Sequence, residues 1–280
     1  MTLEETLAYG RRQLQEAGIA DAALDAWYLL EYIGKFDKSY YYLHGREEID
    51  EEVLQNYQVL VKKRAERVPL QYITGVQMFM GLEFKVNPYV LIPRQDTETL
   101  AETALAVCKP GMRVLDLCTG SGCILISLLH LCEGLVGVGS DISKQALLVA
   151  RENAKANDVD AEWVRSDLFS NLSGTFDVIV SNPPYIPSRV IDTLMPEVRD
   201  FEPVEALDGH EDGLFFYDRI LQECHGFLNP GGYLMLEIGY NQGEAVSERM
   251  RQAGLLDVRV IRDLCGNNRV VCGRKETENV

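Results

Sequence analysis

The sequence has 280 residues, 46% of them hydrophobic, which is enough for one large domain and a small one. Its formal net charge of −16 and pI of about 4.7 repel phosphate backbones, so the composition disfavours a nucleic-acid substrate and favours a protein partner with a basic surface. The charged N-terminus has no apolar run of signal-peptide length, and no stretch approaches the roughly 18 apolar residues of a membrane span. We therefore expect neither secretion nor membrane insertion.

Cysteine and histidine usage bears on the compartment and on metal binding. The seven cysteines are odd in number and form no paired CxxC motif, so they indicate neither a disulfide framework nor a zinc site. The four histidines lack metal-ligand spacing. We therefore expect a protein of the reducing cytoplasm that binds no metal.

The first 75 residues show helical periodicity. Apolar residues recur there at three-to-four spacing, as in Leu54, Tyr57 and Val61, and predict a small helical-bundle domain over residues 1–75. Residues 76–92 then change to short strand-like pieces interrupted by Gly81 and by Asn87-Pro88. This pattern predicts a β-hairpin linker between two domains.

In residues 93–280, strand-like apolar runs alternate with amphipathic helical stretches. Such alternation predicts an α/β domain with a parallel sheet that helices cover on both faces. The short segment 263–268 cannot hold a crossover helix, so the last two strands should pair antiparallel, and a long loop is expected over residues 186–213. The predicted strands are 113–117, 135–140, 161–166, 176–181, 233–238, 256–261 and 269–272, and the predicted helices are 123–132, 144–157 and 214–228.

A glycine-rich turn follows the first strand of this domain, and a helix should begin near Cys123. Glycine lets backbone amides approach a ligand closely, and the start of the helix offers unpaired N–H groups to an anion. The turn therefore suits the methionine carboxylate of S-adenosylmethionine. A dinucleotide would also suit it, but position 125 is leucine where a GxGxxG motif requires glycine. The residues of the turn are Cys118, Thr119, Gly120, Ser121 and Gly122.

Two acidic residues follow the next two strands, at the edge where open α/β sheets bind ligands. Asp141, followed by Ile142, is placed to accept both ribose hydroxyl hydrogens, although Asp141 or Ser143 would also serve as a helix cap. Asp167 is placed to accept the adenine amino hydrogen while Leu168 covers the ring, although an acid at this point is often only a turn residue. Because they continue a series of strand ends that begins at the glycine-rich turn, the cofactor-binding interpretation is favoured.

The tetrad Asn182-Pro183-Pro184-Tyr185 directly follows the fourth strand. Because prolines lack an N–H group, the local polar atoms are mostly acceptors, namely the Asn182 side-chain oxygen and the carbonyls of Asn182 and Pro183. A planar amide or exocyclic amine attacks a sulfonium methyl poorly, since its nitrogen lone pair is delocalised. Acceptors for its two N–H hydrogens would orient the nitrogen and stabilise its developing charge, and Tyr185 would stack on the planar group. The tetrad therefore predicts methyl transfer to such a nitrogen, with a simple Asn-Pro turn as the alternative.

Several segments together resemble the release-factor glutamine methyltransferases, the PrmC (HemK) family. The resemblance implies a seven-stranded, Rossmann-like methyltransferase domain that uses S-adenosylmethionine, and a helical domain that helps to hold the substrate. It also implies methylation of the glutamine in the GGQ motif of peptide chain release factors, and hence a role in translation termination. The tetrad alone is shared with DNA and RNA amino-methyltransferases. The matching segments are 69–75, 91–98, 116–122, 182–185, 201–203, 212–214 and 237–239, with Gln242, Asp263, Gly266 and Arg269.

Three positions depart from the family pattern. Cys118 stands where glycine is usual, Gln95 where proline is common, and His210 near a position that is often glycine. Only Cys118 belongs to the predicted cofactor turn. A small residue fits there if its backbone φ stays negative, so the sequence leaves the backbone conformation at Cys118 open.

The sequence thus predicts an enzyme that methylates the side-chain amide nitrogen, N5, of a release-factor glutamine, with the tetrad as its catalytic and substrate-binding group. Three alternatives remain. A glutamine methyltransferase of a large-subunit ribosomal protein would share the tetrad and much of the framework. An adenine or cytosine amino-methyltransferase should carry a basic face, against which the acidic balance counts. A non-catalytic binding module is disfavoured by the intact Asn182 and Gly120.

Overall fold

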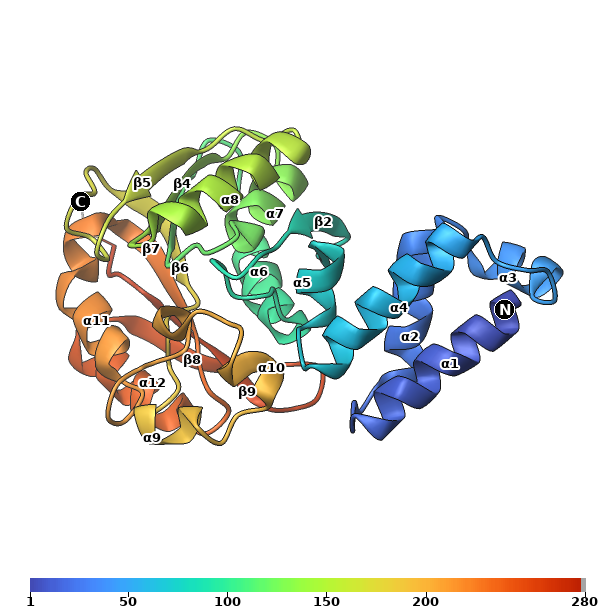
Figure 1. The fold of residues 1–280 in the computed structure, drawn as a ribbon. Helices are drawn as coiled ribbons and strands as arrows, with labels where there is room; N and C mark the ends of the chain where they lie inside the picture. The colour runs from blue at the N-terminus through green and yellow to red at the C-terminus, as the bar shows by residue number, and fades with distance from the viewer. Residues whose placement is uncertain (278–280) are drawn as a thin grey trace. The chain divides into compact units, whose positions relative to one another are not determined.

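Apolar side chains on three helices form the core of an N-terminal unit. In the computed structural model, which describes residues 1–277, this unit contains Met1–Gly75 together with the later segment Met195–Phe201. Its helices are α1 (Leu3–Glu16), α2 (Ala22–Gly34), α3 (Lys38–His44), α4 (Glu51–Ala65) and α5 (Leu70–Thr74). Helices α1, α2 and α4 lie side by side (Figure 1) and bury Leu14, Leu30 and Tyr57 between them. The Thr2 side chain begins α1 through a capping box with Glu5.

An ion cluster holds the later segment within this unit. Helix α10 (Pro196–Arg199) supplies Glu197, whose Oε1 lies 3.1 Å from Nη2 of Arg64 and 3.1 Å from Nη1 of Arg67. Arg64 also donates from Nε to Asp25 Oδ2 at 2.7 Å. The long loop predicted over residues 186–213 is partly helical. It contains the short helices α9 (Ser188–Ile191) and α10 and the 3-10 turn η2 (Val204–Ala206).

A seven-stranded sheet forms the centre of the second unit and confirms the predicted fold (Figure 1). Its order is β5-β4-β3-β6-β7-β9-β8, and β9 runs antiparallel to both of its neighbours, β7 and β8. The turn between β8 and β9 is too short for a crossover, as the sequence indicated. The strands are β3 (Arg113–Leu117), β4 (Val136–Asp141), β5 (Glu162–Arg165), β6 (Phe176–Ser181), β7 (Leu228–Glu237), β8 (Leu256–Arg262) and β9 (Asn268–Arg274).

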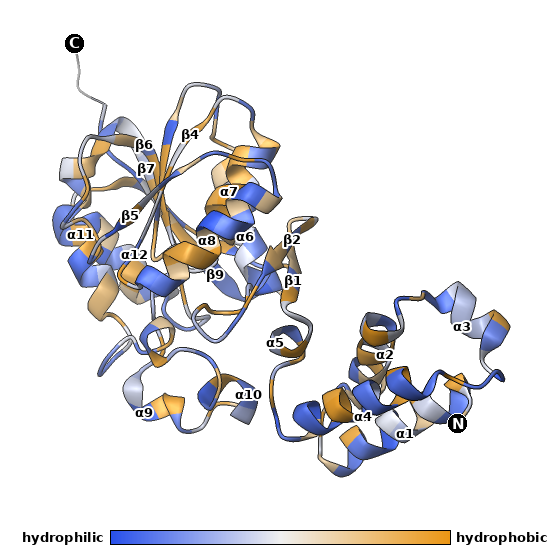
Figure 2. Cartoon of the chain, turned by 45° about the horizontal axis from the view of Figure 1, so that its top comes forward, coloured by the Kyte–Doolittle hydropathy of each residue, from blue (hydrophilic) through white to orange (hydrophobic). Residues whose placement is uncertain are grey.

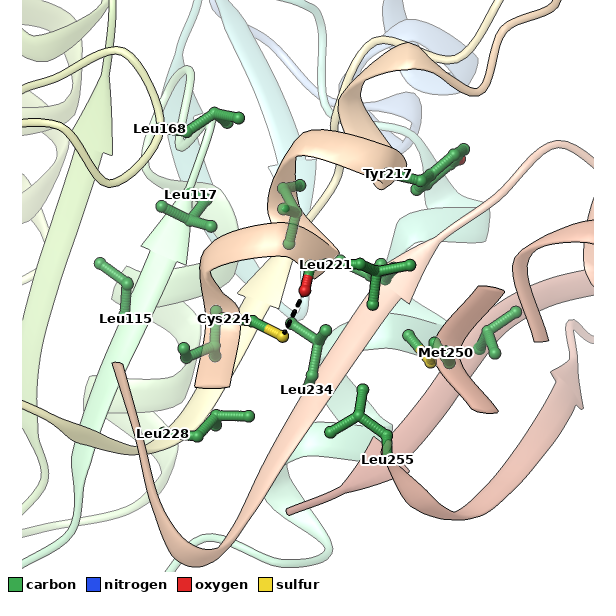
Figure 3. Close-up of a cluster of buried hydrophobic side chains, with 14 of the residues drawn as sticks. Leu115, Leu117, Leu168, Tyr217, Leu221, Cys224, Leu228, Leu234, Met250 and Leu255 are labelled. Carbon is green, nitrogen blue, oxygen red and sulfur yellow. Dashed lines mark hydrogen bonds between the residues drawn. The ribbon is translucent and has the colours of Figure 1, made fainter. Parts of the chain in front are cut away.

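Helices cover both faces of this sheet and enclose two hydrophobic cores. Figure 2 views the sheet nearly edge-on, with α6, α7 and α8 on one side and α11 and α12 on the other. The core under α11 and α12 is drawn in Figure 3, where Leu221 and Cys224 of α11 and Met250 of α12 face Leu234 of β7. The helices are α6 (Glu98–Leu105), α7 (Cys123–Leu131), α8 (Lys144–Ala156), α11 (Phe215–Phe227) and α12 (Gly243–Gln252).

The predicted hairpin is formed by β1 (Val76–Phe79) and β2 (Leu82–Lys85), which pair antiparallel. Phe79 and Phe84 are buried in the core under α6 and α7, so the hairpin belongs to the second unit. Within residues 1–277, no helix is both long and apolar enough to cross a membrane. The same residues contain no cluster of three or more histidine, cysteine or acidic side chains that would hold a metal ion.

Candidate active site

The carboxyl ends of β3, β4 and β6, together with the loop after β5, border a cavity of about 840 Å³. Strand ends of a parallel sheet meet at one edge, and this brings together turns that are far apart in the sequence. Gly122, Pro183 and Tyr185 do not line the cavity. The predicted residues that line it are Cys118, Thr119, Gly120, Ser121, Asp141, Ile142, Asp167, Leu168, Asn182 and Pro184.

The turn after β3 is built from residues with positive φ. Gly120 has φ 56° and Gly122, which precedes α7, has φ 80°. Cys118 has φ 58°, so the condition of a negative φ, under which a small residue fits this turn, is not met. His210, which lies near a position where the resemblance implies glycine, has φ 65°. Both positions lie in the left-handed region, which explains why glycine is favoured there, and the cost to another residue is about 1–2 kcal/mol.

A buried acid that the sequence analysis did not assign fastens this turn to the sheet. Asp116 of β3 is fully buried, and its Oδ2 accepts a 2.6 Å hydrogen bond from the Thr119 hydroxyl. Burial raises the pKa of Asp116 to about 7, and Oδ1 has no partner within residues 1–277. An acid inside the apolar run Val114-Leu115-Asp116-Leu117 was the signal for it, because an aspartate on an interior strand is expected only where structure or function requires it.

Asp141 joins the turn to β4. Its Oδ2 accepts from the backbone N–H of Gly120 at 2.9 Å, and Oδ1 accepts from the N–H of Ser143 at 2.9 Å. Ser143 is the residue that caps α8, since its Oγ accepts from Ala146 N–H. Burial raises the pKa of the Asp141 carboxyl. Each carboxylate oxygen has more than one lone pair, so both keep acceptor capacity toward a ligand in the cavity.

The loop after β5 presents Asp167 and Leu168. Both carboxylate oxygens of Asp167 accept hydrogen bonds from Arg219 of α11, at 2.8 and 3.1 Å. Leu168 is buried, has φ 49° and lies in the core beside the cavity. The ion pair fixes Asp167 at the cavity edge, while its role toward adenine stays a prediction.

Asn182 lies at the end of β6 and reaches across to the segment before α6. Its Nδ2 donates to Thr97 Oγ1 at 3.4 Å, a long hydrogen bond that leaves Oδ1 without a donor among residues 1–277. Asn182 and Pro184 line the cavity. Tyr185 instead directs its hydroxyl at the buried Glu237, with its oxygen 3.3 Å from Oε1. Stacking of Tyr185 on a substrate therefore stays a prediction.

The backbone of Tyr185 is held by residues for which the sequence offered no role. Gln242 donates from Nε2 to the carbonyls of Tyr185 and Gly213, at 3.0 and 3.2 Å. A Cβ added at Gly213, whose φ is 77°, would lie 2.3 Å from the Tyr185 carbonyl oxygen, so only glycine fits. Both residues belong to segments quoted for the resemblance, which alone pointed to them.

One further ion pair borders the cavity. Arg94, a lining residue, donates from Nη2 to both carboxylate oxygens of Glu202, at 2.6 Å each. Glu202 is buried, and this desolvation raises its pKa although Arg94 acts in the opposite direction. The pair ties the segment before α6 to the loop beyond α10, where Pro203 and Val204 also line the cavity.

Comparison with known proteins supports the methyltransferase class that the sequence predicts. A family model described as PrmC N-terminal domain matches residues 5–75, and one described as Methyltransferase small domain matches residues 95–195. A methyltransferase structure from Pyrococcus furiosus aligns with a TM-score of 0.53 at 19% identity, covering 79% of this chain and 99% of that one, and shows the fold alone. The sheet order and the matched domain define the chain as a methyltransferase.

Sequence relatives specify the family. The release factor glutamine methyltransferase of Geobacter sulfurreducens is 40% identical over 98% of this chain and 96% of its own length. That of Clostridium botulinum is 38% identical over 98% of this chain and 100% of its own length. The chain belongs to the release factor glutamine methyltransferase family.

Proposed function

We propose that the enzyme transfers a methyl group from S-adenosylmethionine to the side-chain amide nitrogen, N5, of the glutamine in the GGQ motif of peptide chain release factors. The observation that carries this proposal is the position of Asn182, which lies at the cavity with its Nδ2 engaged by Thr97 and its Oδ1 available as an acceptor. The relatives align with nearly the whole chain, and their names support the release factor as substrate.

The residues at the glycine-rich turn fit S-adenosylmethionine. A Cβ built at Gly120 meets no atom of residues 1–277 within 4 Å apart from its chain neighbours, and Gly120 lines the cavity, so the backbone here is open to it. Asp141 retains acceptor capacity for ribose hydroxyls, and we assign adenine binding to Asp167 and Leu168, which line the same cavity. When bound, the cofactor supplies an electrophilic sulfonium methyl group.

The protein contributes orientation and electrostatic stabilisation. Oδ1 of Asn182 would accept one N–H hydrogen of the glutamine amide and direct its nitrogen at the methyl group. The Pro183 carbonyl stays the predicted second acceptor, although Pro183 does not line the cavity in this structure. As the methyl moves from sulfur to nitrogen, the nitrogen gains positive charge, which these acceptors stabilise. The cofactor would leave as a neutral thioether, and the methylated nitrogen would release one proton to water. No strong general base is needed, because that proton becomes acidic on transfer.

The charge of the chain agrees with a protein substrate. A net charge of −16 attracts a basic protein surface and repels nucleic acid, so no direct nucleic-acid substrate is proposed. We assign substrate recognition to the helical domain, residues 1–75, connection to the hairpin region, residues 76–92, and chemistry to residues 93–280. We place the reaction in the cytoplasm, where its cysteines would stay reduced.

A substrate panel tests the proposal. The purified enzyme is given methyl-labelled S-adenosylmethionine with a release factor, the same release factor carrying Gln→Ala in its GGQ motif, a large-subunit ribosomal protein, and DNA. Label is expected on the first substrate only. Label on the ribosomal protein alone would show that this protein, and not the release factor, is the substrate. Label on DNA alone would refute methylation of a protein.

Replacing the acid after β4 should weaken cofactor binding. In Asp141→Asn one charged acceptor is lost, and charge-assisted hydrogen bonds contribute about 1.5–3 kcal/mol, so the Kd for S-adenosylmethionine should rise by at least ~10-fold. Isothermal titration calorimetry measures this directly. Asp160→Asn makes the same chemical change at an exposed position of the same unit and should leave the Kd unchanged. Equal affinities of Asp141→Asn and wild type would refute the ribose-binding role.

A further inference from the structure

A buried carboxylate lies next to the tetrad without belonging to it. Glu237, the last residue of β7, is 1% exposed. Its Oε1 accepts from the Tyr185 hydroxyl at 3.3 Å, and Oε2 has no direct hydrogen-bond partner among residues 1–277. The Tyr217 hydroxyl donates to the backbone carbonyl of Glu237 at 2.8 Å, which fixes this end of the strand. Because an uncompensated buried carboxylate is costly, its presence at this position calls for a role beyond packing.

Thr97 connects this carboxylate to Asn182. The Thr97 side chain is buried, and its Oγ1 accepts from Asn182 Nδ2. Interaction with the Thr97 hydroxyl also lowers the pKa of the Glu237 carboxyl, so the hydroxyl favours the ionised form. A hydroxyl group has a single hydrogen. When that hydrogen is directed at Glu237, Thr97 can only accept from Asn182.

We propose that Glu237 is a positioning residue that fixes the amide orientation of Asn182 through Thr97, so that Oδ1 and not Nδ2 faces the cavity. The inference rests on the proposed function, because it concerns the acceptor that binds the glutamine amide. An ionised Glu237 accepts from Thr97, Thr97 then accepts from Nδ2, and Oδ1 is left for the substrate. A protonated Glu237 removes this bias, since its own hydrogen can be donated to Thr97, and Thr97 can then donate to Oδ1.

The orientation decides whether the site attracts or repels the substrate. A glutamine NH₂ group carries two donors and needs acceptors. A reversed Asn182 would present its own NH₂ group to that nitrogen, so one acceptor would be lost and two donors would face each other. The positive charge that develops on the nitrogen would then be opposed rather than stabilised.

The groups around Glu237 place the pKa of its carboxyl close to neutral pH. Burial raises its pKa to about 7, while Thr97, Arg269 of β9 and Tyr185 favour the ionised form and Asp96 opposes it. Arg269 is shared, because its Nη2 lies 2.9 Å from Asp96 and 3.1 Å from Asp263. An acid whose ionised form is required loses function as the pH falls through its pKa. We therefore expect kcat to fall below about pH 7 to a lower plateau.

Glu237→Gln tests the proposal by removing the charge at nearly constant volume. At saturating cofactor its kcat should fall about tenfold, the effect of one misdirected hydrogen bond, and the inflection near pH 7 should be absent. The Kd for S-adenosylmethionine should stay within about twofold of wild type, which also verifies folding. Asp116 has a similarly raised pKa, but it lies on β3 and bonds Thr119 of the cofactor turn, so saturation with cofactor suppresses its effect on the profile. Glu248→Gln, at an exposed position of α12, is the matched control and should match wild type throughout.

Two Thr97 variants separate positioning from packing. Thr97→Val keeps the shape and removes the hydroxyl, so it should reproduce the loss of turnover and of the inflection, whereas Thr97→Ser should restore both. Because the two residues act through one chain of hydrogen bonds, Thr97→Val combined with Glu237→Gln should be little worse than either alone. Wild-type kcat and an unchanged inflection in Glu237→Gln, or additive losses in the double variant, would overturn the proposal.

A substrate-independent measurement distinguishes this inference from the proposed function. The side-chain amide NMR signals of Asn182 should shift with an inflection near pH 7 in the wild type and show none in Glu237→Gln. If no release factor is methylated, the proposed function fails, yet the NMR titration still decides whether Glu237 controls Asn182. An Asn182 signal that ignores pH in the wild type would refute the control by Glu237.

Discussion

Replacing Asn182 by alanine is expected to lower turnover by ~10²-fold or more while S-adenosylmethionine binds with nearly unchanged affinity. The variant loses the Oδ1 acceptor, and removal of one preorganised transition-state partner typically costs at least that much in kcat. The glycine-rich turn and Asp141, which we propose hold the cofactor, are on other strand ends and stay intact. Single-turnover transfer of labelled methyl to a release factor, with calorimetry of cofactor binding, measures both quantities.

The controls for this prediction lie in the same unit. Asn267→Ala, at an exposed position between β8 and β9, should leave turnover unchanged. Near-normal turnover in Asn182→Ala would refute the mechanism. A large loss of cofactor affinity in the same variant would instead assign Asn182 to cofactor binding.

The fold could be predicted from the sequence largely because its signals are local. Alternating strands and helices, and the short segment between the last two strands, were sufficient for the sheet and its antiparallel strand. Helix α12 was not predicted, because Val246 and Met250 are its only buried apolar residues with large side chains. The assignment of α10 to the helical unit depends on Glu197 meeting Arg64 across 133 residues, and no local pattern encodes that pairing.

In the candidate site, too, some residues have local sequence signals and others depend on distant contacts. The turns after β3, β4 and β6 were visible because glycines, acids and prolines mark the end of each strand locally. Thr97, Glu237 and Gln242 reach the tetrad from distant segments, so their roles required coordinates. The positive φ of Cys118 could not be predicted from the sequence, because it is set by the turn and not by the size of the residue.

These distant contacts share one feature, which is that each bonds the loop after β6 from another segment. The atoms proposed to touch substrate lie on the loop after β6, and buried groups at the end of β7, just before α12 and in the segment before α6 form hydrogen bonds with that loop. Side chains whose rotamers are fixed by packing and hydrogen bonds lose little freedom on reaching the transition state. The preorganisation that favours amide methylation would therefore arise outside the tetrad.

Arg64→Met is expected to destabilise the helical unit by about 3 kcal/mol, because it leaves Asp25 and Glu197 in buried positions without their shared cation. Arg64 is 8% exposed and bonds both acids, whereas Arg67 bonds only one of the two, Glu197. The unfolding of this unit can be followed separately, since Trp27 is its only tryptophan and Trp163 lies in the sheet. In a Trp163→Phe background, the urea midpoint of Trp27 fluorescence should fall. Arg12→Met, the same substitution at an exposed position of α1, should change the free energy of unfolding by no more than about 0.5 kcal/mol.

The pH dependence of this deficit identifies its cause. Burial already raises the pKa of Asp25 in the folded protein, and loss of Arg64 should raise it further above the unfolded value. The folded variant then binds more protons than its unfolded chain in the window between the two pKa values, so its stability falls as the pH rises through that window. The deficit relative to wild type should therefore be smaller at pH 5 than at pH 8. A deficit that is independent of pH would indicate lost packing of the arginine stem, and equal midpoints would show that the ion cluster adds no stability to the helical unit.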